Sequence, residues 1–265
     1  MPAVNALRTN RVMTDNSPQL LADNPARDSR FKVADQWSDC INFAEDDPLR
    51  EIEFFHRQMN EEVDSLECSA RNLSDFPDTP WELRMCLARQ CVDEARHARM
   101  FRQIFESRGG RIGEYPVLNF QYRIVMNLDS LISRLAVQNR SFEAGGLDAI
   151  KSGIELASQN GDEELVALYE AQCADEISHI RFANDWIRKA TSDDPRTVLQ
   201  IGAALNLAKQ AFEIVMGPEA TDGVHYPADV SGRQEAGFTD QEVDLAIRLQ
   251  DQPQSGRSAN STTKS

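Results

Sequence analysis

Two amphipathic stretches of this sequence carry the same pair of residues, and that repetition limits how the chain can fold. Around Glu94 and His97, large apolar residues recur at alternating steps of four and three, the spacing of the buried stripe of a packed helix. The same spacing surrounds Glu176 and His179. Because residues i and i+3 lie on one face of a helix, each stretch directs a carboxylate and an imidazole into the core.

Two further stretches each direct one carboxylate into the core. Glu62 continues an apolar stripe that contains Phe55 and Met59. Glu143 ends a stripe that contains Ala136 and Asn139. Both stripes have the helical spacing, so we expect four helices that each carry one inward Glu.

The spacing of these residues along the chain shows an internal repeat. Glu62 and Glu94 are 32 residues apart (94 − 62), and Glu143 and Glu176 are 33 apart (176 − 143). Each half of the chain is therefore a helix with Glu, a turn, and a helix with Glu-x-x-His. Two such hairpins related by a pseudo-two-fold axis would bring four Glu and two His to one point.

Helix boundaries are marked by prolines, glycines and capping residues. The predicted helices begin at Asp47-Pro48, at a capping box over Thr79–Glu82, at about Gln121, at Asn160–Asp162 and at Asp194-Pro195. The predicted ends are about Asn72, Gly109-Gly110, about Ala190 and Gly217-Pro218, followed by an irregular segment at 219–240 and a short helix at 239–250. No segment alternates as a strand does, so we expect an all-α fold.

Loop lengths favour one arrangement of these helices. The first two helices are joined by a short loop, as are the third and fourth, whereas residues 109–120 form a longer link between the pairs. This is the loop pattern of a ferritin-like four-helix bundle with a crossover connection. The fifth helix and an irregular C-terminal segment are additions to that bundle. We expect one domain over residues 31–250, between a flexible N-terminal tail (1–30) and a disordered C-terminal tail (251–265).

Composition restricts the class of protein. A net charge of −15 disfavours a nucleic-acid-binding surface, which needs clustered Lys and Arg. No run of about 18 apolar residues predicts a membrane span, and the N-terminus lacks the apolar core of a secretory signal. The five cysteines are odd in number and form no Cys-x-x-Cys pair, so we expect reduced thiols in the cytoplasm.

Four carboxylates in one core require compensating charge. A single Glu on a helix seam is usually an edge residue or an Arg partner, and a single Glu-x-x-His is weak evidence in a chain with 43 acidic residues. Burying four carboxylates together is costly and adds mutual repulsion, which cations remove. Two helices with Glu and two with Glu plus His match the ligands of di-iron and di-manganese proteins. Such ligands suit two Fe ions, with Mn/Fe or Mn/Mn pairs as alternatives.

These motifs resemble those of the ferritin-like superfamily, and more narrowly those of the DUF455 family. The stretches that carry the resemblance are EVDSLE (62–67), DEARH (93–97), FEAGGLD (142–148), DEISH (175–179) and RQEAGF (233–238). The resemblance implies metal ligation by Glu62, Glu94, His97, Glu143, Glu176 and His179. It also implies that Glu94 and Glu176 bridge the two metals. Glu61 is the alternative to Glu62, although it lies one position off the seam.

Two aspartates are candidates for a supporting role. Asp93 and Asp175 each precede the Glu of a Glu-x-x-His. In related di-iron oxygenases, an Asp at this place accepts a hydrogen bond from the non-ligating nitrogen of a histidine ligand. A carboxylate there fixes the tautomer of the imidazole and raises its basicity. Arg96 either offsets the acidic charge of this shell or lies on the helix surface.

Several other residues allow two interpretations. Gly145-Gly146 marks either a kink or bulge that opens the site or a helix end, because glycine is unfavourable inside a helix. Tyr169 is either a redox-active neighbour or a core tyrosine. His56 is either an additional ligand or a packing residue, and His225 belongs to no motif.

By resemblance, we expect a non-haem di-iron oxidase or oxygenase. It would activate O2 to hydroxylate, desaturate, cleave or N-oxygenate a small organic substrate, with a pocket built by the fifth helix and the C-terminal segment. An external electron donor and a homodimer are compatible with this function, and no nucleic acid or membrane is expected as a partner. The alternatives are a rubrerythrin-like peroxidase or iron-handling protein, and a metal-stabilised binding module. The fold alone does not choose among them.

Overall fold

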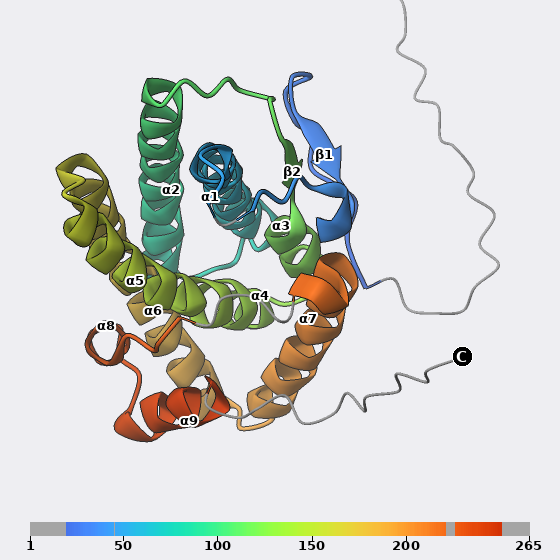
Figure 1. Cartoon of the computed structure of the whole chain (residues 1–265). Coiled ribbons are helices and arrows are strands. Elements are labelled where there is room, and N and C mark those ends of the chain that lie inside the picture. The colour runs from blue at the N-terminus through green and yellow to red at the C-terminus, as the bar shows by residue number, and fades with distance from the viewer. Residues whose placement is uncertain (1–19, 45, 221–225, 251–265) are drawn as a thin grey trace, which may run out of the picture.

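The structure is mostly helical (Figure 1), as the sequence predicts. It is a computed structural model that describes residues 20–44, 46–220 and 226–250. Its long helices are α1 (Leu49–Asp75), α2 (Trp81–Ser107), α5 (Ala144–Asn160), α6 (Glu163–Asp193) and α7 (Thr197–Ala220). The shorter ones are η1 (Trp37–Asp39), α3 (Phe120–Val125), α4 (Leu131–Val137), the π-helix η2 (Gln138–Glu143), α8 (Val230–Glu235) and α9 (Asp240–Gln250). Strands β1 (Lys32–Ala34) and β2 (Pro116–Leu118) pair in parallel.

The long helices pack in pairs. α1 packs along α2, and α5 packs along α6. α2 also packs against α6, so these two helices join the pairs (Figure 1). The π-helix η2 contacts α6 as well, whereas α7 packs on α3 and α4. Four segments of the chain, namely α1, α2, η2 and α6, therefore meet in the interior.

Apolar clusters lie at two levels of this interior. One cluster includes Phe55 of α1, Phe101 of α2 and Tyr169 of α6. Another includes Leu87 of α2 and Ala183 of α6. The turns of α2 and α6 between the two clusters carry buried polar side chains. Apolar residues therefore cover this polar layer at both of its ends along the helices.

Several predicted helix ends are confirmed. The Asp162 carboxylate caps α6 by accepting from the Leu165 amide at 3.1 Å, and it thereby satisfies an amide that the first helical turn leaves unpaired. Helical geometry is interrupted at Gly217, where φ is +70°. At the first helix the position is right but the cap is wrong: α1 begins at Leu49, Pro48 is the residue before it, and no side chain caps the helix. The Asp47 carboxylate accepts from the Leu49 amide at 2.8 Å in the turn that leads into α1.

The predicted capping box at the start of α2 is wrong. The helix does begin directly after Pro80, but no side chain caps it. The Thr79 hydroxyl instead donates to the carbonyl of Phe76 at 2.7 Å. The Thr79 hydroxyl therefore stabilises the turn before α2. Local hydrogen bonds of this kind commonly compete with helix capping.

The third predicted helix is broken into several pieces. It begins near Gln121 as expected, but the chain leaves helical geometry after α3 and restarts at Ser130, whose hydroxyl accepts from the Ser133 amide at 3.2 Å. A π-helix then precedes α5. Gly145-Gly146 lies in the first turn of the regular helix α5, so the chain is not kinked at the glycines and the helix does not end there. The bulge lies directly before them, in the π-helix, where the wider turn changes the direction of the side chains.

Two further expectations need correction. The chain does contain strands, but β1 and β2 have three residues each and are too short to show alternation. The segment expected to be irregular contains α8, which is capped by Asp229 accepting from the Gly232 amide at 3.1 Å. The short terminal helix is confirmed as α9, and the predicted C-terminal tail (251–265) lies outside the described residues.

The part of the predicted N-terminal tail that the structure describes is held against α1. Arg27 donates to Asp64 at 2.6 Å, to Glu67 at 2.7 Å and to Asn60 at 3.0 Å. Asp64 is fully buried, so its charge depends on this guanidinium. Three acceptors on one helix face therefore bind residues 20–30 to the folded chain.

Replacing Arg27 with alanine is expected to destabilise the fold by about 3 kcal/mol, because it leaves a buried carboxylate without its partner. Urea unfolding followed by circular dichroism would measure the change. The matched control is Arg30→Ala, whose partner Asp28 is exposed; it should stay within about 0.5 kcal/mol of wild type. Equal stability of the two variants would contradict the proposed role of Arg27.

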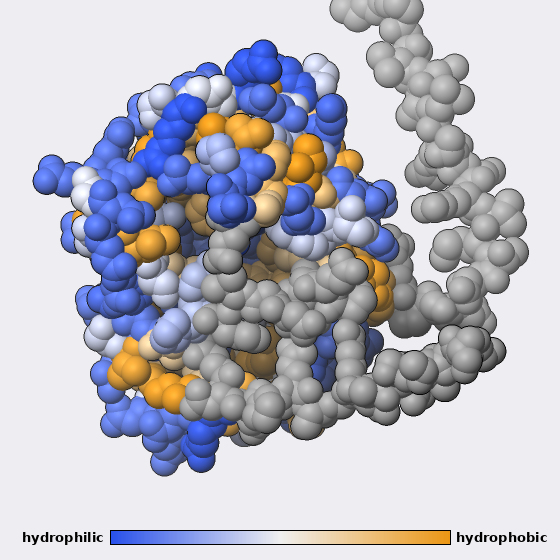
Figure 2. All heavy atoms as spheres, viewed as in Figure 1, coloured by the Kyte–Doolittle hydropathy of each residue, from blue (hydrophilic) through white to orange (hydrophobic). Residues whose placement is uncertain are grey.

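The visible surface is predominantly polar. Figure 2 shows hydrophilic residues over most of the described part of this face, with hydrophobic residues in separate patches. This distribution agrees with the net charge of −15. Among the helices that the structure describes, none is long and apolar enough to cross a membrane.

Candidate metal centre

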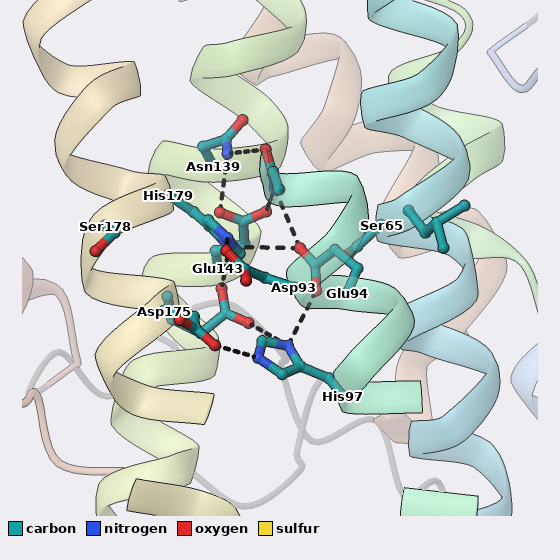
Figure 3. Close-up of polar contacts among 12 residues, drawn as sticks. Ser65, Asp93, Glu94, His97, Asn139, Glu143, Asp175, Ser178 and His179 are labelled. Atoms are coloured by element: carbon teal, nitrogen blue, oxygen red, sulfur yellow. Dashed lines mark hydrogen bonds and ion pairs between the residues drawn. The ribbon is translucent and has the colours of Figure 1, made fainter. Parts of the chain in front are cut away.

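Six buried side chains from four segments converge between the apolar clusters (Figure 3). One group consists of Glu62, Glu94, His97 and Glu176, and a second consists of Glu94, Glu143, Glu176 and His179. Within each group, one ligand atom from every residue lies within 4.8 Å of the others. Glu94 and Glu176 belong to both groups. The structure thus brings together all six residues that the sequence motifs single out.

The two histidines are oriented alike. The Nδ1 atom of His97 faces the carboxylates of Glu62 at 3.3 Å and Glu94 at 3.2 Å. The Nδ1 atom of His179 lies 3.5 Å from oxygens of both Glu94 and Glu176. Each ring thus presents the same nitrogen to the centre, which leaves Nε2 for an outer partner.

The outer partners of the histidines are exchanged between the helices. His97 of α2 contacts Asp175 of α6 through Nε2 at 3.1 Å, and His179 of α6 contacts Asp93 of α2 at 3.3 Å. The predicted aspartate–histidine contacts are therefore present, in a crossed arrangement (Figure 3). Each contact fixes the ring orientation and also ties α2 to α6.

Arginines on the outer face of α2 hold both aspartates. Arg89 donates through Nε to the two carboxylate oxygens of Asp93 at 2.7 and 2.8 Å. Arg96 forms an ion pair with Asp175, so its role is to offset the acidic shell. Burial alone would raise the pKa of Asp93, but hydrogen bonds from His179 and Arg89 outweigh it and lower the pKa to about 2. Asp93 can thus stay charged and accept from the His179 imidazole.

The pKa values of several central groups are raised, whereas that of Glu94 is lowered by hydrogen bonding and by the charges of the histidines. Burial, helped by the charges of Glu94 and Glu176, raises the pKa of Glu62 to about 8. Burial also raises the pKa of Glu143 well above its usual range. For His97, burial alone would lower the pKa, but hydrogen bonds to Glu62 and Glu94 outweigh it and raise the pKa to about 10. In the absence of cations, protons therefore compensate part of the carboxylate charge.

Glu143 is surrounded by side-chain amides. Gln90 donates through Nε2 to Glu143 Oε1 at 2.6 Å and to Glu94 Oε1 at 3.2 Å. Asn139 donates to Glu143 Oε2 at 3.0 Å and to Gln90 Oε1 at 3.1 Å. Gln138 completes the set at 3.4 Å from Glu143 Oε1. Both oxygens of this carboxylate thus accept from amides.

The donor set fits a pair of cations. Glu176 Oε2 and His179 Nδ1 are buried 3.5 Å apart, and neither has a partner in hydrogen-bond geometry among the described residues. Unpaired buried polar atoms are costly, and a cation ligated by both would satisfy them. Four carboxylates and two imidazoles are the ligands that iron and manganese accept.

Other candidate residues lie outside this centre. The Glu61 carboxylate pairs with Arg57 at 3.2 Å, so the structure places Glu62 and not Glu61 in the cluster. Tyr169 packs against Phe101 in an apolar cluster, and burial raises the pKa of its phenol. These positions favour the interpretation of Tyr169 as a core residue.

His56 is also a packing residue in this structure. Its ring is buried near Phe105, and its Nε2 accepts from the Gly113 amide at 2.9 Å. Burial lowers the pKa of His56 to about 4, so the ring is neutral near pH 7. His225 lies outside the described residues.

An open hollow of about 330 Å³ lies on the outer side of the centre, between α2 and α6. Its lining residues are Met85, Cys86, Arg89, Asp93, Ser178, His179 and Phe182. Two residues of the centre, Asp93 and His179, are thus part of its lining, and its walls are mainly apolar. This hollow is formed by α2 and α6, and a pocket at the fifth helix and the C-terminal segment stays a prediction.

Comparison with known proteins identifies a family. A family model described as "Protein of unknown function (DUF455)" matches residues 2–244. The chain belongs to the DUF455 family. No curated protein and no solved structure matches it. The DUF455 match includes all six converging residues, so the resemblance inferred from the motifs is confirmed at the level of this family.

Sequence reasoning assigned no role to the amides of this DUF455 protein. Gln90, Asn139 and Gln172 each stand four residues before an inward Glu (94 − 90, 143 − 139 and 176 − 172). Positions four residues apart are neighbours on a helix face. An amide at that place on a buried stripe is a signal for a carboxylate partner. It does not show which carboxylate is bound, since Gln172 donates to Glu62 of another helix at 2.8 Å.

Proposed function

We propose that this protein is a di-iron oxidase of the ferritin-like type that oxidises a small organic molecule with O2. The observation that carries the proposal is the pair of overlapping four-residue groups that share Glu94 and Glu176. Two carboxylates common to both groups are what a bridged metal pair requires. When bound, an iron pair supplies two electrons to O2.

The arrangement of helices supports the ferritin-like part of the proposal. α1 with α2, and α5 with α6, form two hairpins that meet along α2 and α6. The first hairpin contributes Glu62 from α1 and a Glu-x-x-His from α2. At the second hairpin, Glu143 comes from η2 directly before α5, and the other Glu-x-x-His comes from α6. The ligands of ferritin-like carboxylate proteins have this distribution over four helices.

The residues of the chain have separable tasks in this function. Glu62 and His97 would hold one iron, and Glu143 and His179 the other, with the two shared glutamates between them. Asp93 and Asp175 orient the imidazoles by accepting from Nε2. The apolar clusters at either side of the polar layer limit its contact with water. A dry and preorganised site strengthens each of these electrostatic interactions.

The hollow between α2 and α6 is our candidate for the entry of a small molecule. Its volume of about 330 Å³ lies at the lower end of the range of small-molecule pockets. Met85 and Phe182 offer apolar contacts, and Arg89 and Ser178 offer polar ones. Such a lining suits a small, mainly apolar substrate with one hydrogen-bonding group.

Anaerobic loading with Fe²⁺ followed by exposure to O2 tests this function. We expect two irons per chain and O2 consumption by the iron-loaded protein, because both groups of ligands can then be filled. Protein loaded with redox-inert Zn²⁺ is the control and should consume no O2. Fewer than two bound irons, or iron-loaded protein that leaves O2 unconsumed, would contradict the proposal. Continued oxidation of many Fe²⁺ per chain would instead indicate an iron-handling protein.

A further inference from the structure

The two halves of the centre differ in how their terminal glutamates are hydrogen-bonded. Glu62 accepts one amide hydrogen bond on Oε1, from Gln172 at 2.8 Å, and its Oε2 faces His97. Glu143 accepts amide hydrogen bonds on both oxygens, from Gln90 and Asn139. One terminal carboxylate therefore presents an oxygen free of amides to the centre, and the other does not.

The side chain of Gln90 contacts two of the ligand carboxylates at once. Its Nε2 atom donates to oxygens of two different ligands, Glu94 and Glu143, at 3.2 and 2.6 Å. The nitrogen thus lies between two carboxylates that belong to the same four-residue group. A cation that used these same two oxygens would compete with the Gln90 amide for them.

The Gln90 side chain is held in this place through its carbonyl oxygen, which accepts a hydrogen bond from Asn139. Gln90 is fully buried, and its Oε1 accepts from Asn139 at 3.1 Å. Asn139 and Glu143 both belong to the π-helix η2, and Figure 3 shows Asn139 at the opposite end of the cluster from His97. The wider π turn therefore places the carboxylate and the amide that fixes Gln90 on one short segment.

The opposite half of the site lacks this arrangement. Gln172 holds the place in α6 that Gln90 holds in α2, four residues before the Glu of Glu-x-x-His. Its amide contacts Glu62 on the oxygen that faces away from His97. Gln172 thus supports a ligand from outside, whereas Gln90 stands between two ligands.

We infer that Gln90 blocks one of the two metal positions, the one formed by Glu94, Glu143, Glu176 and His179, and we call this blocking amide a latch. Its amide occupies the space of the cation between Glu94 and Glu143 and has to leave when that position is filled. The two positions then bind metal with different affinities, and the Glu143–His179 position is the weaker one. This inference rests on the proposed di-metal function and adds a control on how the pair is assembled.

Titration of the metal-free protein with Mn²⁺, followed by electron paramagnetic resonance, tests the latch. We expect two binding steps, of which the second produces the signal of a spin-coupled pair. Glu143→Gln should lose the weaker step and retain the stronger one, whereas Glu62→Gln should lose the stronger step. Two equal steps in the wild-type protein would overturn the inference.

Gln90→Leu decides whether the amide competes with the metal. Loss of a hydrogen bond to a charged group that must be broken on binding should tighten the weaker step by about tenfold or more. The matched control is Gln172→Leu, which should leave that step unchanged because its amide does not stand between two ligands. An unchanged or weakened second step in Gln90→Leu would overturn the latch. Melting curves in chelator show that each variant is folded.

The same titration separates this inference from the proposed function. If the wild-type protein binds two Mn²⁺ ions in equal steps, the di-metal centre stands and the latch fails. If it binds none, the di-metal centre itself fails. Because Mn²⁺ binding is measured directly, the result does not depend on catalytic activity.

Discussion

Glu176→Gln is expected to abolish binding at both metal positions while leaving the metal-free fold nearly intact. Glu176 belongs to both groups of ligands, so its loss removes an oxygen donor from each position. In the metal-free protein, burial and the charge of Glu94 raise the pKa of Glu176, which disfavours its ionised form. A neutral amide of the same shape should therefore change the free energy of unfolding by no more than about 1 kcal/mol.

Elemental analysis after equilibrium dialysis measures the bound metal, and urea unfolding in chelator measures the stability. Glu170→Gln is the matched control, because it makes the same change at an exposed position of the same helix. The control should bind as much metal as the wild type. If Glu176→Gln also binds both ions, the assignment of Glu176 as a shared ligand is wrong.

As pH rises, we expect the stability of the metal-free protein to fall and its affinity for metal to rise. In the metal-free protein, the pKa of Glu62 is raised to about 8 and that of His97 to about 10. Both folded-state values exceed those of the unfolded chain, so the folded state binds more protons and its stability falls as pH rises through this range. Metal ions displace these protons, so their affinity rises with pH over the same interval.

The melting temperature of the metal-loaded protein should therefore exceed that of the metal-free protein by a margin that widens from about pH 6 to about pH 8.5. At a free metal concentration about 1,000 times Kd, one site alone stabilises the fold by about 4 kcal/mol. Calorimetry with Mn²⁺ against chelator measures both effects, and Mg²⁺ serves as a control for ionic strength. A constant difference across this pH range would show that these protons are not displaced by the metal.

Much of the centre could be predicted from local patterns. Periodicity identified Glu94 and His97 as inward-facing, because a helix places i and i+3 on one face whatever surrounds it. The same rule identified Glu176 and His179. The cap at Asp162 marked a helix start correctly, since a cap acts within one turn.

Predictions failed where a residue that often starts or ends a helix makes a different contact or is tolerated within the helix. The Thr79 hydroxyl satisfies the preceding turn and not α2. The glycine pair at 145–146 is tolerated inside α5, while the nearby distortion occurs at η2. Local propensities in these segments are weak, so tertiary packing decides between alternatives of similar energy.

The sequence by itself determined the helical class and which residues face inward, because both follow from the period of a helix. Only the tertiary structure decided how those residues are paired. His97 takes its outer partner Asp175 from 78 residues away, and Gln90 reaches Glu143 across 53 residues. Such contacts depend on the relative placement of α2, η2 and α6. That placement is set by packing and charge compensation between elements, which no pattern within a single element contains.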